Sequence, residues 1–207
     1  MRIFSLALAF LVLNGSAAWA GHINSVRDLP DELKNLRKGR LSSADITLLD
    51  IKIGQETLDD VRSLFGNTIL FREPPNSVSA EDELCYSSTD SSDETHLIFG
   101  SGPMGGWSQI TTFQVLSRRP KDLPCTPTSL VTRVVATEGG IRLGMSTKEL
   151  RAKYGRPTEQ GQGFVIYSFE QKSDHPKRKD FDMLSGVSAT VSNERVTSFQ
   201  IFLIESN

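Results

Sequence analysis

The sequence predicts an α+β fold of two tandem repeats, each a short helix packed on an antiparallel sheet of about three to four strands. Three observations support this prediction. A helix signal at 53–66 recurs at 143–155, the strand patterns that follow the helix recur in the same order, and the last strands of the two sets agree position by position. Recurrence of order and spacing indicates repeated structural units.

Both copies of the helix signal begin with a capping box. In each, a hydroxyl is placed to accept from the third helical amide while a carboxylate accepts from the amide of the cap; the pairs are Thr57 with Asp60 and Ser146 with Glu149. One face of each helix is apolar, formed by Leu58, Val61, Leu64 and Phe65 in the first copy and by Leu150 and Tyr154 in the second. Gly66 and Gly155 end the helices, because glycine tolerates left-handed conformations.

Short runs rich in β-branched and aromatic residues follow each helix and predict strands. They are 68–71, 84–87, 97–99 and 110–116 in the first copy, and 164–169, 187–191 and 196–204 in the second. The stretches Ile-Thr-Thr-Phe-Gln-Val-Leu at 110–116 and Val-Thr-Ser-Phe-Gln-Ile-Phe at 196–202 both alternate apolar with polar residues, as half-buried strands do. Extended segments at 46–49 and 51–53 lead into the first helix, and a strand at 130–136 is expected to introduce the second copy.

The repeats predict a division of the chain into five segments. These are a signal peptide (1–20), a polar N-terminal segment (21–45) in which 30–38 could form a short helix, repeat 1 (46–117), a proline-containing linker (118–129) and repeat 2 (130–207). The alternative is that two unrelated helix-then-strand stretches coincide.

The first twenty residues have the features of a secretory signal peptide. Arg2 precedes an apolar core at 3–13, and Ala18-Trp19-Ala20 is a small-x-small cleavage site, so we expect cleavage after Ala20 and a periplasmic or secreted protein. The alternative is a buried N-terminal helix or a retained anchor. No later segment approaches the ~20 apolar residues of a membrane-spanning helix, so no transmembrane segment is expected.

The charge of the chain is weakly acidic. The formal net charge of −2 becomes −3 when Arg2 is removed, which offers no general attraction to nucleic acid or to an anionic membrane. Acidic residues cluster around the first Cys (Glu81, Asp82, Glu83, Asp90, Asp93, Glu94), and basic ones lie in the corresponding loop of the second repeat (Lys172, His175, Lys177, Arg178, Lys179). This pattern indicates attraction between the repeats or a bipolar surface for partners; solvated loops are the alternative.

Cys85 and Cys125 are the only cysteines, and an even pair in an exported protein predicts a disulfide. Two reduced, buried thiols are the alternative. The spacing excludes a Cys-x-x-Cys redox motif.

The sequence predicts no catalytic residue, no cofactor and no metal. His22, His96 and His175 are the only histidines, and none lies in a recognisable nucleophile or zinc motif. Asp93 and Glu94 beside His96 leave metal ligation as an alternative to a solvated loop. The stretch 100–105 matches the dinucleotide fingerprint in letters, but a strand rather than a helix follows it, so a hairpin loop is predicted.

Met104 and Trp107 lie in that loop, which is shorter in the second repeat. Tryptophan on a loop is a frequent hot spot of protein interfaces, so these two residues are the hypothetical partner-binding site. The alternative is that Trp107 folds back over the core of its own repeat.

The pattern of an apolar residue and Gly, a capped helix, an aromatic residue and Gly, and then strands is similar to that of the β-lactamase-inhibitor-protein-like superfamily, which includes the small outer-membrane lipoprotein of the barrel-assembly machinery. The resemblance covers 51–116 and 140–204 and is carried by Gly54, Gly66, Gly144, Ser146, Gly155 and Pro157. It implies a tandem α+β module whose sheet binds other envelope proteins. The chain departs from the lipoprotein in having no Cys at the cleavage point, and no functional residue is carried over.

These observations favour an exported, non-catalytic module that binds another envelope or secreted protein, in an inhibitory or envelope-assembly role, and no nucleic acid. One alternative is a small-ligand or lipid carrier, with Phe113, Phe199 and Phe202 lining a cleft between helix and sheet. Another is a hydrolase that uses His96 or His175.

Overall fold

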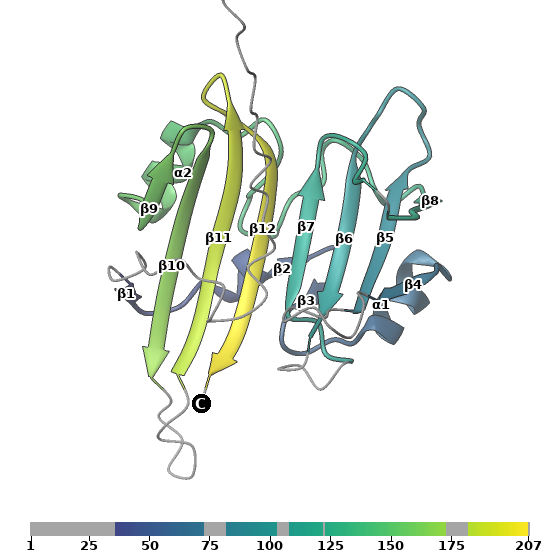
Figure 1. Ribbon diagram of the computed structural model, residues 1–207, viewed down its shortest axis with the longest axis horizontal. Helices are drawn as coiled ribbons and strands as arrows, with labels where there is room; N and C mark the ends of the chain where they lie inside the picture. Colours follow the sequence, from purple (N-terminus) through teal and green to yellow (C-terminus); the bar gives the residue numbers. More distant parts are fainter. Residues whose placement is uncertain (1–35, 73–81, 103–107, 122, 173–181, 207) are drawn as a thin grey trace, which may run out of the picture.

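The structure is a computed structural model that describes residues 36–72, 82–102, 108–121, 123–172 and 182–206. It is mostly β, with two short helices. One mixed ten-stranded sheet has the order β1-β10-β11-β12-β7-β6-β5-β4, with β8 added to β5 and β9 to β10 (Figure 1). The strands β2 and β3 form a separate hairpin. None of the helices in these ranges is long and apolar enough to cross a membrane.

The strands of the large sheet are β1 (Arg37–Lys38), β4 (Leu70–Arg72), β5 (Asp82–Ser88), β6 (His96–Ser101), β7 (Thr112–Leu116), β8 (Thr126–Thr128), β9 (Glu159–Gly161), β10 (Phe164–Lys172), β11 (Asp182–Ser192) and β12 (Arg195–Ser206). The hairpin consists of β2 (Thr47–Leu48) and β3 (Ile51–Lys52). The α-helices are α1 (Leu58–Phe65) and α2 (Thr147–Tyr154), and a short 3-10 helix, η2, spans Ser43–Ile46.

The prediction of short helices with antiparallel strands is confirmed, but the chain does not form two repeat units. The sequence does not decide between one continuous sheet and two lobes, and in the structure the strands of both predicted repeats form one sheet. The antiparallel strands β5, β6 and β7 lie on one side of its middle and β12, β11 and β10 on the other (Figure 1). They are joined where β7 pairs with β12, the two strands whose sequences agree position by position. Residues 46–117 and 130–206 are called the first half and the second half below.

The contact between β7 and β12 is symmetric about Gln114 and Gln200, which lie opposite each other. At its two ends Leu203 N–H donates to Thr111 O at 2.9 Å, and Ser117 N–H donates to Thr197 O at 3.1 Å. The glycine before each helix makes the same contact in both halves. Gly54 N–H donates to Ile110 O and Gly144 N–H to Val196 O, each at 2.8 Å.

The main hydrophobic core lies between one face of the sheet and the two helices. Leu58, Val61 and Phe65 of α1 and Leu150 and Tyr154 of α2 are buried in it, together with Phe113 and Phe199 of the central strands. The last residue of each helix packs on a tyrosine of the sheet, with ring centroids 5.1 Å apart for Phe65 and Tyr86 and 5.2 Å for Tyr154 and Tyr167. Packing of this kind holds helices that are too short to be stable alone.

Both predicted capping boxes are present. The carboxylates of Asp60 and Glu149 accept from the backbone N–H of Thr57 at 2.8 Å and of Ser146 at 2.7 Å. In return, the hydroxyls of Thr57 and Ser146 accept from the N–H of Asp60 and Glu149. Hydrogen bonds from the hydroxyl and then the backbone N–H of the cap lower the pKa of Asp60 and the pKa of Glu149.

The caps predict a loss of stability in acid. A carboxyl whose pKa is lowered by folding stabilises the folded state above its ordinary pKa, 3.8 for Asp60 and 4.5 for Glu149. This contribution is lost as the pH falls through the folded-state pKa. Urea unfolding between about pH 5 and about pH 3 is expected to show a smaller decrease in unfolding free energy for the variant Asp60→Asn/Glu149→Gln than for the wild type. Equal decreases would contradict the assignment.

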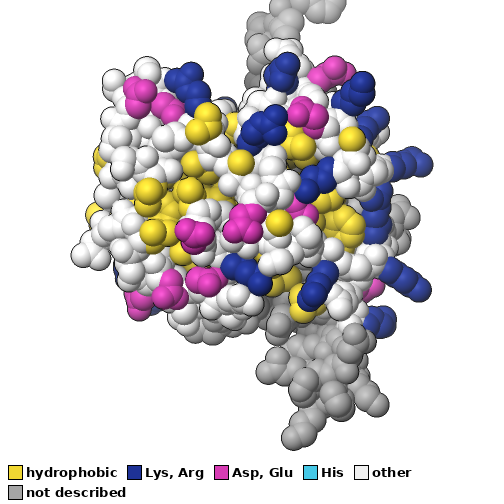
Figure 2. All heavy atoms as spheres, turned by 180° about the vertical axis from the view of Figure 1, so that it is seen from behind, with side chains coloured by type: hydrophobic (Ala, Val, Ile, Leu, Met, Phe, Trp, Pro, Cys, Tyr) yellow, Lys and Arg dark blue, Asp and Glu magenta, His cyan; other side chains and the backbone are white. Residues whose placement is uncertain are grey.

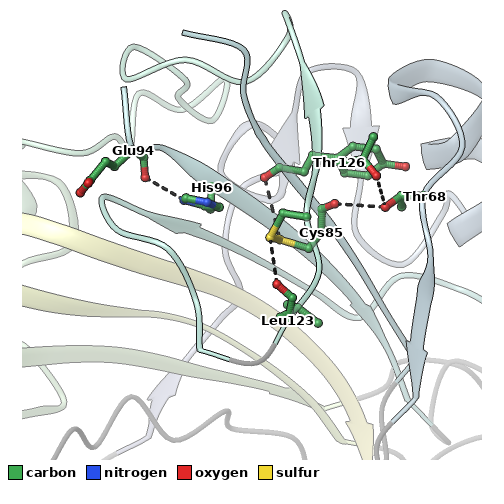
Figure 3. The surroundings of a disulfide bond; sticks show 8 residues. Thr68, Cys85, Glu94, His96, Leu123 and Thr126 are labelled. Carbon is green, nitrogen blue, oxygen red and sulfur yellow. Dashed lines mark hydrogen bonds between the residues drawn. A yellow bond between two sulfur atoms is a disulfide. The ribbon is translucent and has the colours of Figure 1, made fainter. Parts of the chain in front are cut away.

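The opposite face of the sheet carries two smaller apolar clusters. One consists of Ile166, Leu184, Phe202 and Ile204, with Leu36 and Phe164 packed against it. The other surrounds the predicted disulfide, which is present between Cys85 of β5 and Cys125, with Cα atoms 4.5 Å apart (Figure 3). Ile98 and Leu123 are buried beside it. The bond therefore fastens the segment between the halves onto the face opposite the helices.

Several predicted elements differ from the structure. The segment 130–136 is not a strand; it forms turns that bury Val131 and Val135 in the main core. Arg37 and Lys38, placed at the end of a possible helix, form the edge strand β1, and the rest of that helix lies outside the described residues apart from Leu36. The strands β8 and β9 had no signal, because three-residue strands are too short for an alternating pattern.

Candidate functional site

Four large apolar side chains are exposed among the described residues, and they lie in two segments of the chain. Leu64, 44% exposed, is in the last turn of α1, and Ile69, 66% exposed, follows the helix. Leu130, 37% exposed, and Val134, 75% exposed, follow β8. We call Leu64, Ile69, Leu130 and Val134 the apolar surface.

Hydrogen bonds hold the two segments of the apolar surface together. Thr126 Oγ1 donates to Thr68 Oγ1 at 2.7 Å, which joins β8 to the residue before Ile69 (Figure 3). Tyr86 of β5 donates its hydroxyl to Gly66 O, directly after α1, at 2.8 Å. Burial of this hydroxyl raises the pKa of Tyr86 to about 12, so it stays a donor at neutral pH. The end of α1 is thus fixed to both β5 and β8.

Acidic residues border the apolar surface. Asp93, in the loop between β5 and β6, accepts from the backbone N–H of Arg133 at 2.6 Å, and Arg133 lies between Leu130 and Val134 in the sequence. Burial acts to raise the pKa of Asp93, but hydrogen bonds from Thr95 and Arg133 lower it overall. Hydrogen bonds from Ser92 lower the pKa of Asp90 in the same loop. Asp90 and Asp93 are therefore ionised at neutral pH, close to the cation of Arg133.

An exposed apolar surface with a charged rim has the composition of a protein-binding site, in which an apolar centre excludes water and a polar rim remains hydrated. The apolar surface was missed in the sequence, because Leu64 falls at the same helical spacing as Leu58, Val61 and Phe65. These three are buried, as predicted, whereas Leu64 is exposed. Its position at the edge of the apolar stripe is the only signal that could have indicated this.

Two members of the predicted acidic cluster are not solvated. Asp82 is buried at the start of β5, where both of its carboxylate oxygens accept from the guanidinium of Arg72 at 2.6 Å. Glu83 is also buried. Asp90 and Glu94 are exposed, Asp93 is half-buried, and Lys172 is exposed at the end of β10. Glu81, His175, Lys177, Arg178 and Lys179 lie outside the described residues.

The predicted chemical motifs are placed as follows. His96 is buried in β6, with Nδ1 2.7 Å from Glu94 O (Figure 3). In the described part of the chain, no three His, Cys, Asp or Glu side chains are arranged to hold a metal ion. Gly100 and Ser101 of the glycine-rich run end β6. Met104 and Trp107, the hypothetical partner-binding residues, lie outside the described residues, as do His22 and His175.

The cleft expected for a ligand carrier is not formed by its three phenylalanines. Phe113 and Phe199 are buried in the main core, whereas Phe202 belongs to the cluster on the other face of the sheet. A cavity of about 560 Å³ lies elsewhere, between the β2–β3 hairpin and the ends of β11 and β12. Arg40, Lys52, Gln55 and Gln109 make much of its lining polar.

Comparisons of the chain with models of protein families, with curated proteins and with solved structures give no match. The resemblance to the β-lactamase-inhibitor-protein-like superfamily therefore stays a prediction from its motif residues.

Proposed function

We propose that the chain is an exported, non-catalytic module that binds another envelope or secreted protein through the apolar surface. The observation that carries the proposal is the exposure of Leu64 and Ile69 at the end of α1, which a hydrogen bond between Thr68 and Thr126 joins to the segment that contains the exposed Leu130. The acidic rim at Asp90 and Asp93 favours a partner with basic residues around an apolar centre. The disulfide is consistent with an oxidising, extracytoplasmic compartment.

The proposal predicts that Leu64→Ser/Ile69→Ser loses its partner while keeping its fold. Both side chains are exposed, so their removal is expected to change the unfolding free energy by less than about 0.5 kcal/mol each. Loss of interface anchors typically costs a complex about 2 kcal/mol or more, which is roughly thirtyfold in affinity. The measurement is crosslinking and capture from periplasmic extract, followed by the affinity of the captured protein for both forms.

The control for this experiment is Gln162→Ser, which changes an exposed side chain in the second half. It is expected to capture the same proteins as the wild type. Unchanged affinity of the double variant would reject the apolar surface as the binding site. The same measurement on Trp107→Ala tests the loop hypothesis separately: lost stability with unchanged partners would assign Trp107 to the core.

We also propose that the two halves descend from one duplicated helix-and-strand unit. Support comes from the symmetric register of β7 and β12 and from the equal contacts of Gly54 and Gly144. The two capping boxes on helices of equal length give further support. Duplication followed by divergence explains why the two halves share the same helix-and-strand framework but differ in their surface residues.

A further inference from the structure

Basic side chains gather along the edge of the molecule formed by α2, β9, β10 and β1. Figure 2 shows Lys and Arg crowded along its right-hand side, where the second half lies. The contributing residues are Arg37, Lys38, Lys148, Arg151, Arg156 and Lys172, which we call the basic edge. β1 and β9 both pair with β10, and Arg37 donates to Tyr154 O at the end of α2, so these elements adjoin one another.

Most cations of the basic edge form no ion pair within the part of the chain that the structure describes. Lys38, Lys148, Arg156 and Lys172 are exposed, and none forms an ion pair with another described residue. Arg151 donates to the neutral side chain of Gln160 at 2.9 Å. Lys153 is not counted, because its Nζ lies 2.9 Å from Oδ1 of the buried Asp45. Carboxylates of the same elements, such as Glu159 and Glu170, are fewer than the cations.

The fold does not require Lys148 and Arg156, because α1 has no cation at either equivalent position and is otherwise built in the same way. Both helices have eight residues, a capping box, buried apolar positions and a terminal glycine. When the helices are aligned on these features, Asp59 corresponds to Lys148 and Asn67 corresponds to Arg156. Residues 46–117 hold Lys52, Arg62 and Arg72 against eleven acidic residues, whereas 130–207 hold eleven basic and nine acidic ones.

We propose that the basic edge binds the surface of an anionic phospholipid bilayer. Patches of Lys and Arg are attracted to such surfaces and need no shaped pocket. Each cation close to the lipid raises the partition coefficient of the protein onto the membrane about fivefold. Protein interfaces, in contrast, combine Arg with aromatic residues and Met and are depleted in Lys. The exposed large apolar side chains of the described chain all belong to the apolar surface and none to the basic edge.

This inference goes beyond the protein-binding function and does not depend on it. The net charge of the whole chain predicted no attraction to an anionic membrane, because the sum averages an acidic first half with a basic second half. The charges nearest the lipid determine the attraction, because dissolved salt screens the interaction between charges that are more than about 8–10 Å apart. None of the four residues of the apolar surface belongs to the basic edge, so the two surfaces are separate sets of side chains.

The test is sedimentation of the full protein, with its signal peptide removed, with phospholipid vesicles. Binding is expected to vesicles containing about one-third phosphatidylglycerol, to be weak on pure phosphatidylcholine, and to fall as salt rises from about 0.02 M to about 0.3 M. The variant Lys148→Gln/Arg156→Asn is expected to bind the anionic vesicles roughly twentyfold less tightly. Arg62→Gln is the matched control, because Arg62 holds on α1 the position of Arg151 on α2.

Each outcome decides the proposal. Equal binding to anionic and neutral vesicles, or equal binding by the wild type and the double variant, overturns it. A loss of about fivefold on Arg62→Gln, the loss expected for any one cation, also overturns it, because the effect would then come from overall charge. Titration with inorganic phosphate distinguishes the two sources of phosphate: tight binding of the free anion would indicate a local anion site and contradict a membrane surface. Thermal unfolding of the variants, expected to be unchanged, excludes misfolding as the cause.

Discussion

Removing the disulfide with Cys85→Ala/Cys125→Ala is expected to lower the free energy of unfolding by about 4 kcal/mol. The bond closes a loop across a sequence separation of 40 residues, and opening this loop gives the unfolded chain more conformations. The two sulfurs are also part of the cluster around Leu123, so the segment between the halves loses its covalent bond to β5 and is held there by the pairing of β8 with β5. Urea unfolding of both proteins measures the difference.

A reducing agent supplies the control for the disulfide. It is expected to lower the urea midpoint of the wild type towards that of the double variant and to leave the double variant unchanged. A wild-type midpoint that is the same with and without reductant would contradict the expectation. A variant that remains folded but less stable would show that the sheet forms without the bond.

Phe99→Ala is expected to cost about 3–5 kcal/mol, because it leaves a cavity at the centre of the main core. Phe99 is fully buried in β6, with its ring centroid 5.3 Å from that of Phe65 on α1 and 6.4 Å from that of Phe113 on β7. Its removal therefore weakens the packing of both the helix and the neighbouring strand. Chemical unfolding monitored by circular dichroism gives the loss.

The matched control is Phe99→Leu, which keeps most of the volume and is expected to cost less than about 1.5 kcal/mol. A loss below about 1 kcal/mol for Phe99→Ala would mean that the core around α1 rearranges to fill the space, contrary to the packing described here.

Local signals in the sequence predicted most of the regular structure. The caps at Thr57 and Ser146 place both helices correctly, and the short runs rich in β-branched and aromatic residues correspond to β4–β7 and β10–β12. Phe113 and Phe199 occupy matching positions in the two alternating runs, and both are buried in the main core. The strand prediction for 130–136 is wrong for a physical reason. Val131 and Val135 are buried in the main core by turns, and apolar residues can be buried without forming a strand.

The pairing of the halves into one sheet could not be read from the sequence. A strand pattern specifies which face is buried but not which strand lies alongside. The two matching stretches at β7 and β12 were predicted as equivalent elements of separate units, whereas they are each other's neighbours.

The candidate site was less predictable than the fold. Exposure of Leu64 depends on what packs beside the end of α1, which the helical period does not determine. The sequence directed attention instead to Trp107, which lies outside the described residues. The basic residues of α2 are evident in the sequence, but the net charge of the whole chain carries no information about where they lie.

The pairing of β7 with β12 also bears on the order in which the chain folds. The strands β5, β6 and β7 are close in sequence, as are β10, β11 and β12, so each set can assemble through short loops. Joining the two sets requires contacts between residues as distant as Gln114 and Gln200, and such long-range closure is slow. The disulfide joins β5 to the connecting segment and does not shorten this path. We therefore expect each set to form first and the joining of β7 to β12 to set the rate of folding.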